Sequence, residues 1–124
     1  LIHVKGDSGP RCGVSMKGGD IIVEGKIGYL SGFMAHAGRI IALGGADEAC
    51  ADSLWGGEVW VAGPIESLGV DSKIAQPSDD EVEQIEALLT SRGLEDSSRS
   101  WQKIVSAERL WHFESRDASA WLMI

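Results

Sequence analysis

The stretch IIVEG at residues 21–25 returns twice at a spacing of 19 residues, as IIALG at 40–44 and as VWVAG at 59–63. A partial first copy, IHVKG, occupies residues 2–6. Each copy is a short, mostly β-branched run closed by glycine, which is typical of a β-strand that ends in a turn. One supersecondary unit is therefore repeated about four times.

The glycines keep the same spacing as the strands. Two sets recur every 19 residues: Gly6, Gly25, Gly44 and Gly63, and Gly19, Gly38 and Gly57. We assign them to corners of the chain that need positive φ angles. Because this period leaves no room for a helix between strands, the sequence predicts a mainly β fold, a right-handed parallel β-helix with 19-residue turns. Nineteen is not a multiple of six, which argues against the left-handed hexapeptide helix.

Alternation along each strand separates inward from outward side chains. Two inward columns are predicted: Ile2, Ile21, Ile40 and Val59, and Val4, Val23, Ala42 and Val61. The outward positions include an apolar set, which we call the outer stripe: Ile22, Ile41, Leu43 and Trp60. An apolar surface of this kind needs a cover. The cover is either the chain's own C-terminal part or another protein.

Cys12 and Cys50 are two periods apart, with Ser31 between them in the same column. Two turns of the coil would separate the cysteines by about 9.6 Å, beyond the ~7 Å limit for a disulfide. The sequence thus predicts free thiols, as in a reducing compartment. No histidine shares their column, so we assign no catalytic role to either thiol.

Residues 1–75 form the predicted β-helix, and 76–124 form a C-terminal tail that has a single glycine, Gly93. The tail opens with a capping box, Ser78-Asp79-Asp80-Glu81. A helix is expected from there to Arg92-Gly93. Its apolar face is predicted to comprise Val82, Ile85, Leu88 and Leu89.

Beyond the helix, the sequence has a short amphipathic segment around Trp101, Ile104 and Val105. A stretch without a clear period follows, with five large apolar residues: Leu110, Trp111, Phe113, Trp121 and Leu122. Such a segment usually docks on something. We expect Trp111 and Phe113, like the outer stripe, to belong to an interface. They either fold back over the open end or the outer stripe of the coil, or grip a partner subunit.

Composition excludes several classes of protein. The chain has 124 residues, 44% of them hydrophobic, and a net charge of −8. No apolar run approaches the ~20 residues of a membrane-spanning helix. Negative charge repels phosphate backbones and anionic lipids. We therefore expect a cytoplasmic protein that binds neither nucleic acid nor membrane.

The sequence contains no phosphate-binding loop, no G-x-S-x-G, no H-E-x-x-H and no paired C-x-x-C. Gly6-Asp7-Ser8-Gly9-Pro10 is similar to a loop around a serine nucleophile, but the repeat already accounts for its glycines. His3, His36 and His112 are far apart in sequence and lack the i, i+4 partner of a helical metal site. We accordingly predict no catalytic residue, cofactor or metal in this chain.

One family resemblance rests on the repeat. Met16-Lys17-Gly18-Gly19-Asp20-Ile21-Ile22-Val23-Glu24-Gly25, with Gly28 and Gly32, resembles the repeat of the GXGXG domain, over residues 1 to about 70. That right-handed β-helix occurs in the glutamate synthase large subunit and in a structural component of formylmethanofuran dehydrogenase. Trp101-Gln102-Lys103-Ile104-Val105 and Leu110-Trp111-His112-Phe113 are similar to the tail of stand-alone glutamate-synthase-like subunits, including the small β-helix subunit of N-methylglutamate synthase.

The resemblance implies a non-catalytic structural subunit or domain that holds a glutaminase-type amidotransferase against an FMN-containing synthase. FMN and an iron–sulfur cluster would belong to the synthase partner, and the catalytic cysteine to the amidotransferase. Because the chain opens inside a strand, upstream turns are expected to be missing. Two alternatives stay open: a stand-alone solenoid enzyme acting on a sugar or acyl donor, and the structural subunit of a formylmethanofuran dehydrogenase.

Overall fold

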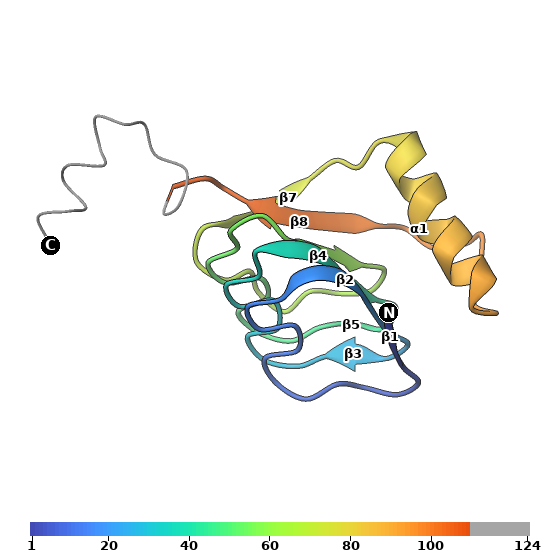
Figure 1. Cartoon of the computed structure of the whole chain (residues 1–124), viewed down its shortest axis with the longest axis horizontal. Helices are drawn as coiled ribbons and strands as arrows, with labels where there is room; N and C mark the ends of the chain where they lie inside the picture. The colour runs from blue at the N-terminus through green and yellow to red at the C-terminus, as the bar shows by residue number, and fades with distance from the viewer. Residues whose placement is uncertain (110–124) are drawn as a thin grey trace, which may run out of the picture.

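The computed structural model describes residues 1–109 (Figure 1). Four strands stack in parallel on one face of the coil. Each residue of a strand lies beside the equivalent residue of the next turn. Ile2 lies beside Ile21, Ile21 beside Ile40, and Ile40 beside Val59. These strands are β1 (Ile2–Val4), β2 (Lys17–Val23), β4 (Ala37–Ala42) and β6 (Glu58–Val61). The register confirms the mainly β fold and the parallel β-helix.

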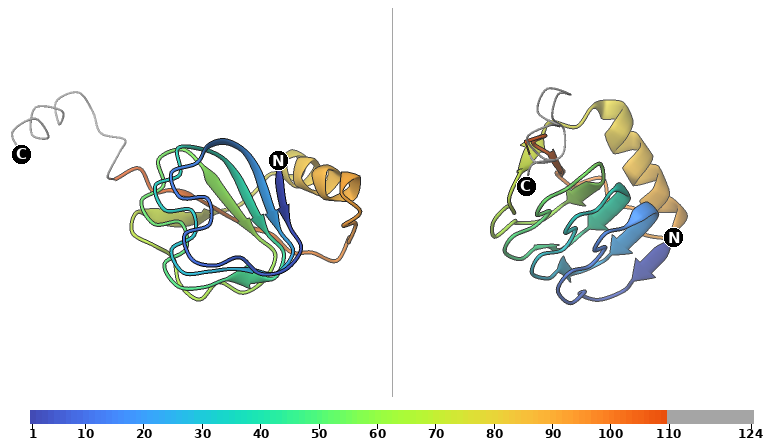
Figure 2. Two further views of the ribbon diagram at one scale, coloured as in Figure 1. Left: turned by 60° about the horizontal axis from the view of Figure 1, so that its bottom comes forward. Right: turned by 60° about the vertical axis from the view of Figure 1, so that its left-hand side comes forward.

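A second, narrower face of the coil is built from β3 (Lys26–Ile27) and β5 (Gly45–Ala46), which pair in parallel. A parallel bridge from Ala46 to Ile65 continues this face into the last turn. The view in the right half of Figure 2 shows the turns stacked like steps, with the helix alongside. Short strands thus occur on two faces of the two middle turns.

The predicted inward columns form the core of the coil. Val23, Ile40 and Val59 are fully buried and pack with residues from the other faces, including Ile27 and Leu54. Ile2 differs from the prediction because 59% of it is exposed. It belongs to the first turn, which has no described turn beneath it.

The repeated glycines serve two different purposes. Gly19 and Gly38 have φ angles of 80° and 95°, as predicted for corners. Gly44 has no positive φ; a Cβ there would lie 2.6 Å from the carbonyl carbon of Gly25. The prediction of positive φ is therefore wrong for Gly6, Gly25, Gly44, Gly57 and Gly63. At Gly44 and Gly63 the requirement is close approach of successive turns, because a Cβ would meet the preceding turn's backbone.

Six other corner positions hold residues with side chains in the left-handed region, and they too recur at 19. The two columns are Arg11, Leu30 and Ala49 (φ 58°, 61° and 58°), and Ser15, Met34 and Ser53 (φ 53°, 55° and 54°). Left-handed backbone costs about 1–2 kcal/mol per residue without glycine. The coil geometry therefore imposes these angles against local preference.

After the last turn the chain adds β7 (Ser72–Ala75), the helix α1 (Asp79–Ser91) and β8 (Gln102–Ser106). β8 lies antiparallel between β6 and β7, so the sheet order is β1-β2-β4-β6-β8-β7. The amphipathic segment around Trp101 and Ile104 is thus mostly a strand, and Ile104 closes the core against Val59. One sheet runs across the predicted boundary at residues 75 and 76.

Candidate functional site

The outer stripe lies beneath α1. Ile22, Ile41 and Trp60 are at most 1% exposed, and they form one cluster with Ile85 and Leu89 of the helix. Leu43 is half-buried against the same cluster. Each large side chain buried in this way contributes about 1.5–3 kcal/mol. The sequence allows two covers for the outer stripe, the chain's own C-terminal part or another protein. In the structure, the chain's own C-terminal part covers it.

The helix begins where the capping box places it. The Ser78 hydroxyl accepts from the Glu81 amide at 3.2 Å, and the Ser78 amide donates to the Glu81 carboxylate at 3.0 Å. Three acidic residues in the first turn face the positive end of the helix dipole. The Arg92 amide closes the other end by donating to the Leu89 carbonyl. The predicted helix is thereby confirmed.

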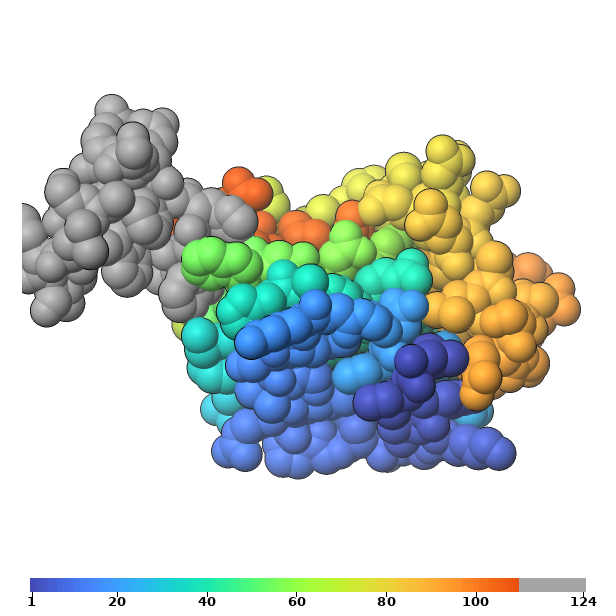
Figure 3. Space-filling view, in the orientation of Figure 1, coloured from blue at the N-terminus to red at the C-terminus, as the bar shows by residue number. Residues whose placement is uncertain are grey.

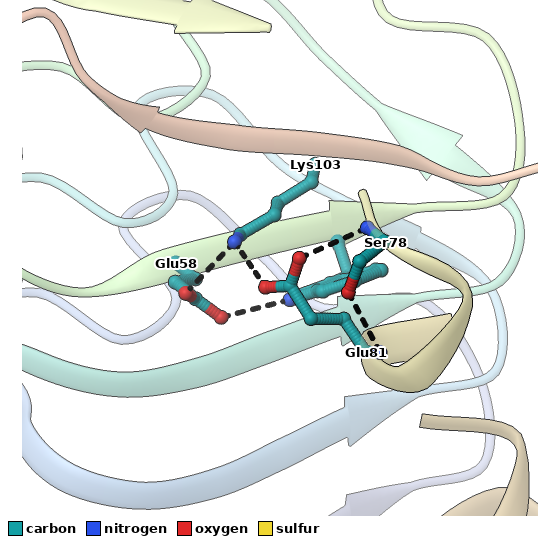
Figure 4. Close-up of polar contacts among 5 residues, drawn as sticks. Glu58, Ser78, Glu81 and Lys103 are labelled. Atoms are coloured by element: carbon teal, nitrogen blue, oxygen red, sulfur yellow. Dashed lines mark hydrogen bonds and ion pairs between the residues drawn. The ribbon is translucent and has the colours of Figure 1, made fainter. Parts of the chain in front are cut away.

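A polar cluster ties the helix N-terminus to the coil (Figure 4). The ammonium of Lys103 on β8 pairs with Glu81 of the helix and, at 3.3 Å, with Glu58 of β6. The other Glu58 oxygen accepts from the Trp60 indole N–H at 3.1 Å. Lys103 and the Ser78 amide lower the pKa of Glu81 to about 2. The capping carboxylate thus also fastens α1 to the sheet.

Two further contacts fasten the middle of the helix. Glu86 accepts from the Trp101 indole N–H at 2.8 Å and pairs with Arg99 at 3.3 Å. The Trp101 ring meets the Trp60 ring edge to face, with centroids 6.1 Å apart. Aromatic pairs of this geometry contribute about 0.5–1.5 kcal/mol beyond burial. The segment after the helix therefore helps to hold it on the outer stripe.

The C-terminal end of the helix meets the first turn of the coil. Arg92 donates to Nδ1 of His3 at 3.3 Å, and the other ring nitrogen of His3 lies 2.7 Å from Glu24. An imidazole that accepts at Nδ1 donates from Nε2, so His3 bridges Arg92 and Glu24. His3 thus has a structural contact and shows no arrangement for catalysis.

The two cysteines are free, as predicted. They stack with Ser31 between them: the Gly32 amide donates to the Cys12 carbonyl, and the Ala51 amide to the Ser31 carbonyl. Burial raises the pKa of Cys50 to about 12 and also raises that of Cys12. Thiols that stay protonated are poor nucleophiles. This environment does not activate either cysteine.

Two shallow hollows flank Trp55, which is 39% exposed and lies 6.1 Å from the His36 ring. One hollow, of about 220 Å³, is lined by Met34, His36, Ser53 and Trp55. The other, of about 400 Å³, includes Glu58, Lys73 and Lys103 in its lining. Their open shape gives no enclosed chamber in which a reaction could be shielded from water.

Within residues 1–109, no three His, Cys, Asp or Glu side chains are placed to hold a metal ion together. The same part of the chain has no helix with the length and apolar character to cross a bilayer. Trp111 and Phe113, the other residues assigned to an interface, lie outside the described residues.

Sequence reasoning missed the role of Lys103. Alternation around Ile104 could have placed Lys103 on the outward side of a strand, had the segment been recognised as one. The capping box identified Glu81, but only for its local contact with Ser78. Their ion pair joins residues 22 apart along the chain, and no local pattern encodes it.

Comparison with protein-family models, with curated proteins and with solved structures found no match for this chain.

Proposed function

We propose that this chain is a non-catalytic β-helix subunit or domain of a glutamate-synthase-type complex. The observation that supports this most is the 19-residue register, which runs unbroken from Ile2 through Ile21 and Ile40 to Val59. The GXGXG-like repeat of the sequence coincides with that register. A coil whose successive turns approach within van der Waals distance at Gly44 is a stiff spacer.

In this proposal the chain holds a glutaminase-type amidotransferase against an FMN-containing synthase in the cytoplasm. The partners carry the chemistry: the amidotransferase contributes a catalytic cysteine, and the synthase contributes FMN and an iron–sulfur cluster. The outer stripe is occupied by α1. In the proposal, partner contacts therefore fall on other surfaces of the coil, such as the exposed side around Trp55.

Co-expression with a glutaminase-type and an FMN-containing subunit of the glutamate synthase family tests the proposal. We expect the chain to co-elute with both proteins in size-exclusion chromatography and to raise glutamine-dependent synthase activity. A Val23→Asp variant is the control, because an unpaired charge in the core costs several kcal/mol and prevents folding. Elution of the folded chain alone, with no gain in activity, would reject the proposal. Activity of the isolated chain on a sugar or acyl donor would favour the alternative enzyme.

A further inference from the structure

The chain leaves the described part of the fold beside Trp55. β8 runs antiparallel to β6, with Ile104 beside Val59. Continuing that register past the end of β8 brings Glu108 level with Trp55. The larger of the two hollows beside Trp55 agrees with this approach, because both residues line it. The residues after Arg109 therefore start next to Trp55.

Asp71 holds this exit in place. Its carbonyl accepts from the Ala107 amide at 2.9 Å, and its carboxylate oxygens accept from the Arg109 amide at 3.0 Å and 3.2 Å. Between them, the Glu108 amide donates to the Ser106 hydroxyl at 3.0 Å. Three successive amides are thus hydrogen-bonded, so the point from which the C-terminal residues depart is fixed.

The smaller hollow, which we call the Trp55 hollow, adjoins this exit, because Trp55 lines both hollows. Its lining is Met34, His36, Ser53 and Trp55, and its volume is about 220 Å³. Trp55 is 39% exposed, and its ring lies 6.1 Å from the His36 ring. Pockets for drug-sized ligands have about 300–1,000 Å³. The Trp55 hollow therefore suits apolar side chains better than a small molecule.

The sequence supplies such side chains within reach of the exit. Trp111 and Phe113 are three and five residues past Glu108. At about 3.3 Å per residue, they reach at most about 10 Å and about 17 Å from it. The Trp55 hollow lies within that reach, since Glu108 and Trp55 line one hollow together.

The other two surfaces of this chain that were expected to receive Trp111 and Phe113 are less suitable. The outer stripe is already occupied by α1. The first turn, blue in Figure 3, lies at the end of the body opposite to β8. The sheet order puts four strand spacings, or about 19 Å, between β8 and β1. Neither ring spans that distance from Glu108.

We propose that residues 110–113 dock on the side of the coil and place Trp111 and Phe113 in the Trp55 hollow. In an extended segment, residues two apart project to the same side, so both rings would face the hollow. Contacts with the rings of Trp55 and His36 would stabilise the docked segment.

Tethering favours this occupant over a second copy or a free partner. A segment joined through a short linker acts at an effective concentration in the millimolar range. A separate protein at lower concentration competes with it only through a much higher affinity for the Trp55 hollow. The inference does not rest on the proposed function: a partner that binds around Trp55 would contact the docked segment as well as the coil.

The first test changes the segment and observes the hollow. It compares nitrogen-15 NMR spectra of the full chain and of the double variant Trp111→Ala with Phe113→Ala. We expect the amide signals of the residues that line the Trp55 hollow to shift. The control, Trp121→Ala with Leu122→Ala, removes two large apolar side chains farther along and should leave those signals in place. No shift, or equal shifts for both double variants, would overturn the proposal.

The second test changes the hollow and observes the segment. Proteolysis of a segment that opens and closes quickly follows the population of its open form. We expect Trp55→Ala to speed chymotrypsin cleavage after Trp111 and Phe113 by about tenfold, as measured by mass spectrometry. The control is Tyr29→Ala, because Tyr29 is 50% exposed and lines a different hollow. It should leave the cleavage rate unchanged.

Equal cleavage rates for the wild type and Trp55→Ala would contradict docking in the Trp55 hollow. Light scattering separates the remaining occupant, and we expect a monomer. A dimer that Trp111→Ala dissociates would assign the hollow to a second copy and overturn the proposal. Because no glutaminase or synthase is present in these experiments, their failure is distinguishable from failure of the proposed function.

Discussion

The glycines of this coil differ sharply in whether a side chain could replace their hydrogen. A Cβ at position 44 would lie 2.6 Å from the backbone of Gly25, whereas a Cβ at position 6 meets nothing within 4 Å. We expect Gly44→Ala to lower the free energy of unfolding by about 1–3 kcal/mol, because the turns must separate. Gly6→Ala, from the same column, should stay within about 0.5 kcal/mol. Urea unfolding measures both, and equal effects would contradict close packing of the turns.

Glu81 links the stability of the chain to pH. Its pKa in the fold is about 2, below the ordinary 4.5, so the charged carboxylate favours the folded state. This contribution is present above pH 4.5 and is lost as the pH falls toward 2. We expect Glu81→Gln, which can still accept from the Ser78 amide, to be less stable than the wild type at neutral pH. The gap should shrink as the pH falls.

Urea midpoints between neutral pH and about pH 3 check this dependence. The control is Glu83→Gln, which removes an exposed charge from the same helix. Its stability should follow the wild type across the range, apart from a constant offset. Parallel curves for Glu81→Gln and the wild type would show that the Glu81–Lys103 pair does not stabilise the fold.

At the scale of elements, the position of α1 can be tested with neighbouring isoleucines. Ile40 faces the interior of the coil and Ile41 faces α1, yet both are 0% exposed. We expect Ile40→Ala and Ile41→Ala each to cost about 2–5 kcal/mol. Ile74→Ala on β7 is the control and should cost much less, because Ile74 is 48% exposed. A mild effect for Ile41→Ala would mean that the helix leaves the outer stripe in solution.

The elements that the sequence predicts best are those with local periodicity. The strands repeat at a constant interval, and the helix carries its own start signal at Ser78 and Glu81. The strand β8 escapes sequence reasoning, because a single run around Ile104 has no repeat to support it. Its pairing with β6 depends on residues more than forty positions away. For the same reason, the sequence does not determine what covers the outer stripe. An amphipathic helix needs a partner surface, but its own sequence does not specify which surface that is.

At the scale of the whole molecule, the tail and the coil share one sheet. β8 belongs to the tail, yet it lies between β6 and β7 and contributes Ile104 to the core of the coil. The predicted boundary at residues 75 and 76 is based on glycine content. It therefore separates two segments that differ in composition but that the fold joins in one sheet. The charged residues are distributed differently. The first turn, residues 1–19, is basic, and it lies at the opposite end of the coil from β8.

This shared sheet leads us to expect a single cooperative unfolding transition. Trp60 and Trp101, two of the five tryptophans, meet at the boundary between coil and helix, so part of the tryptophan fluorescence reports on that boundary. Far-UV circular dichroism reports on the strands and on α1. We expect the two signals to give one urea midpoint, and Ile104→Ala to shift both midpoints together. Loss of helical signal before the fluorescence change would show that α1 unfolds independently, and the outer stripe would then be open to a partner while the coil stays folded.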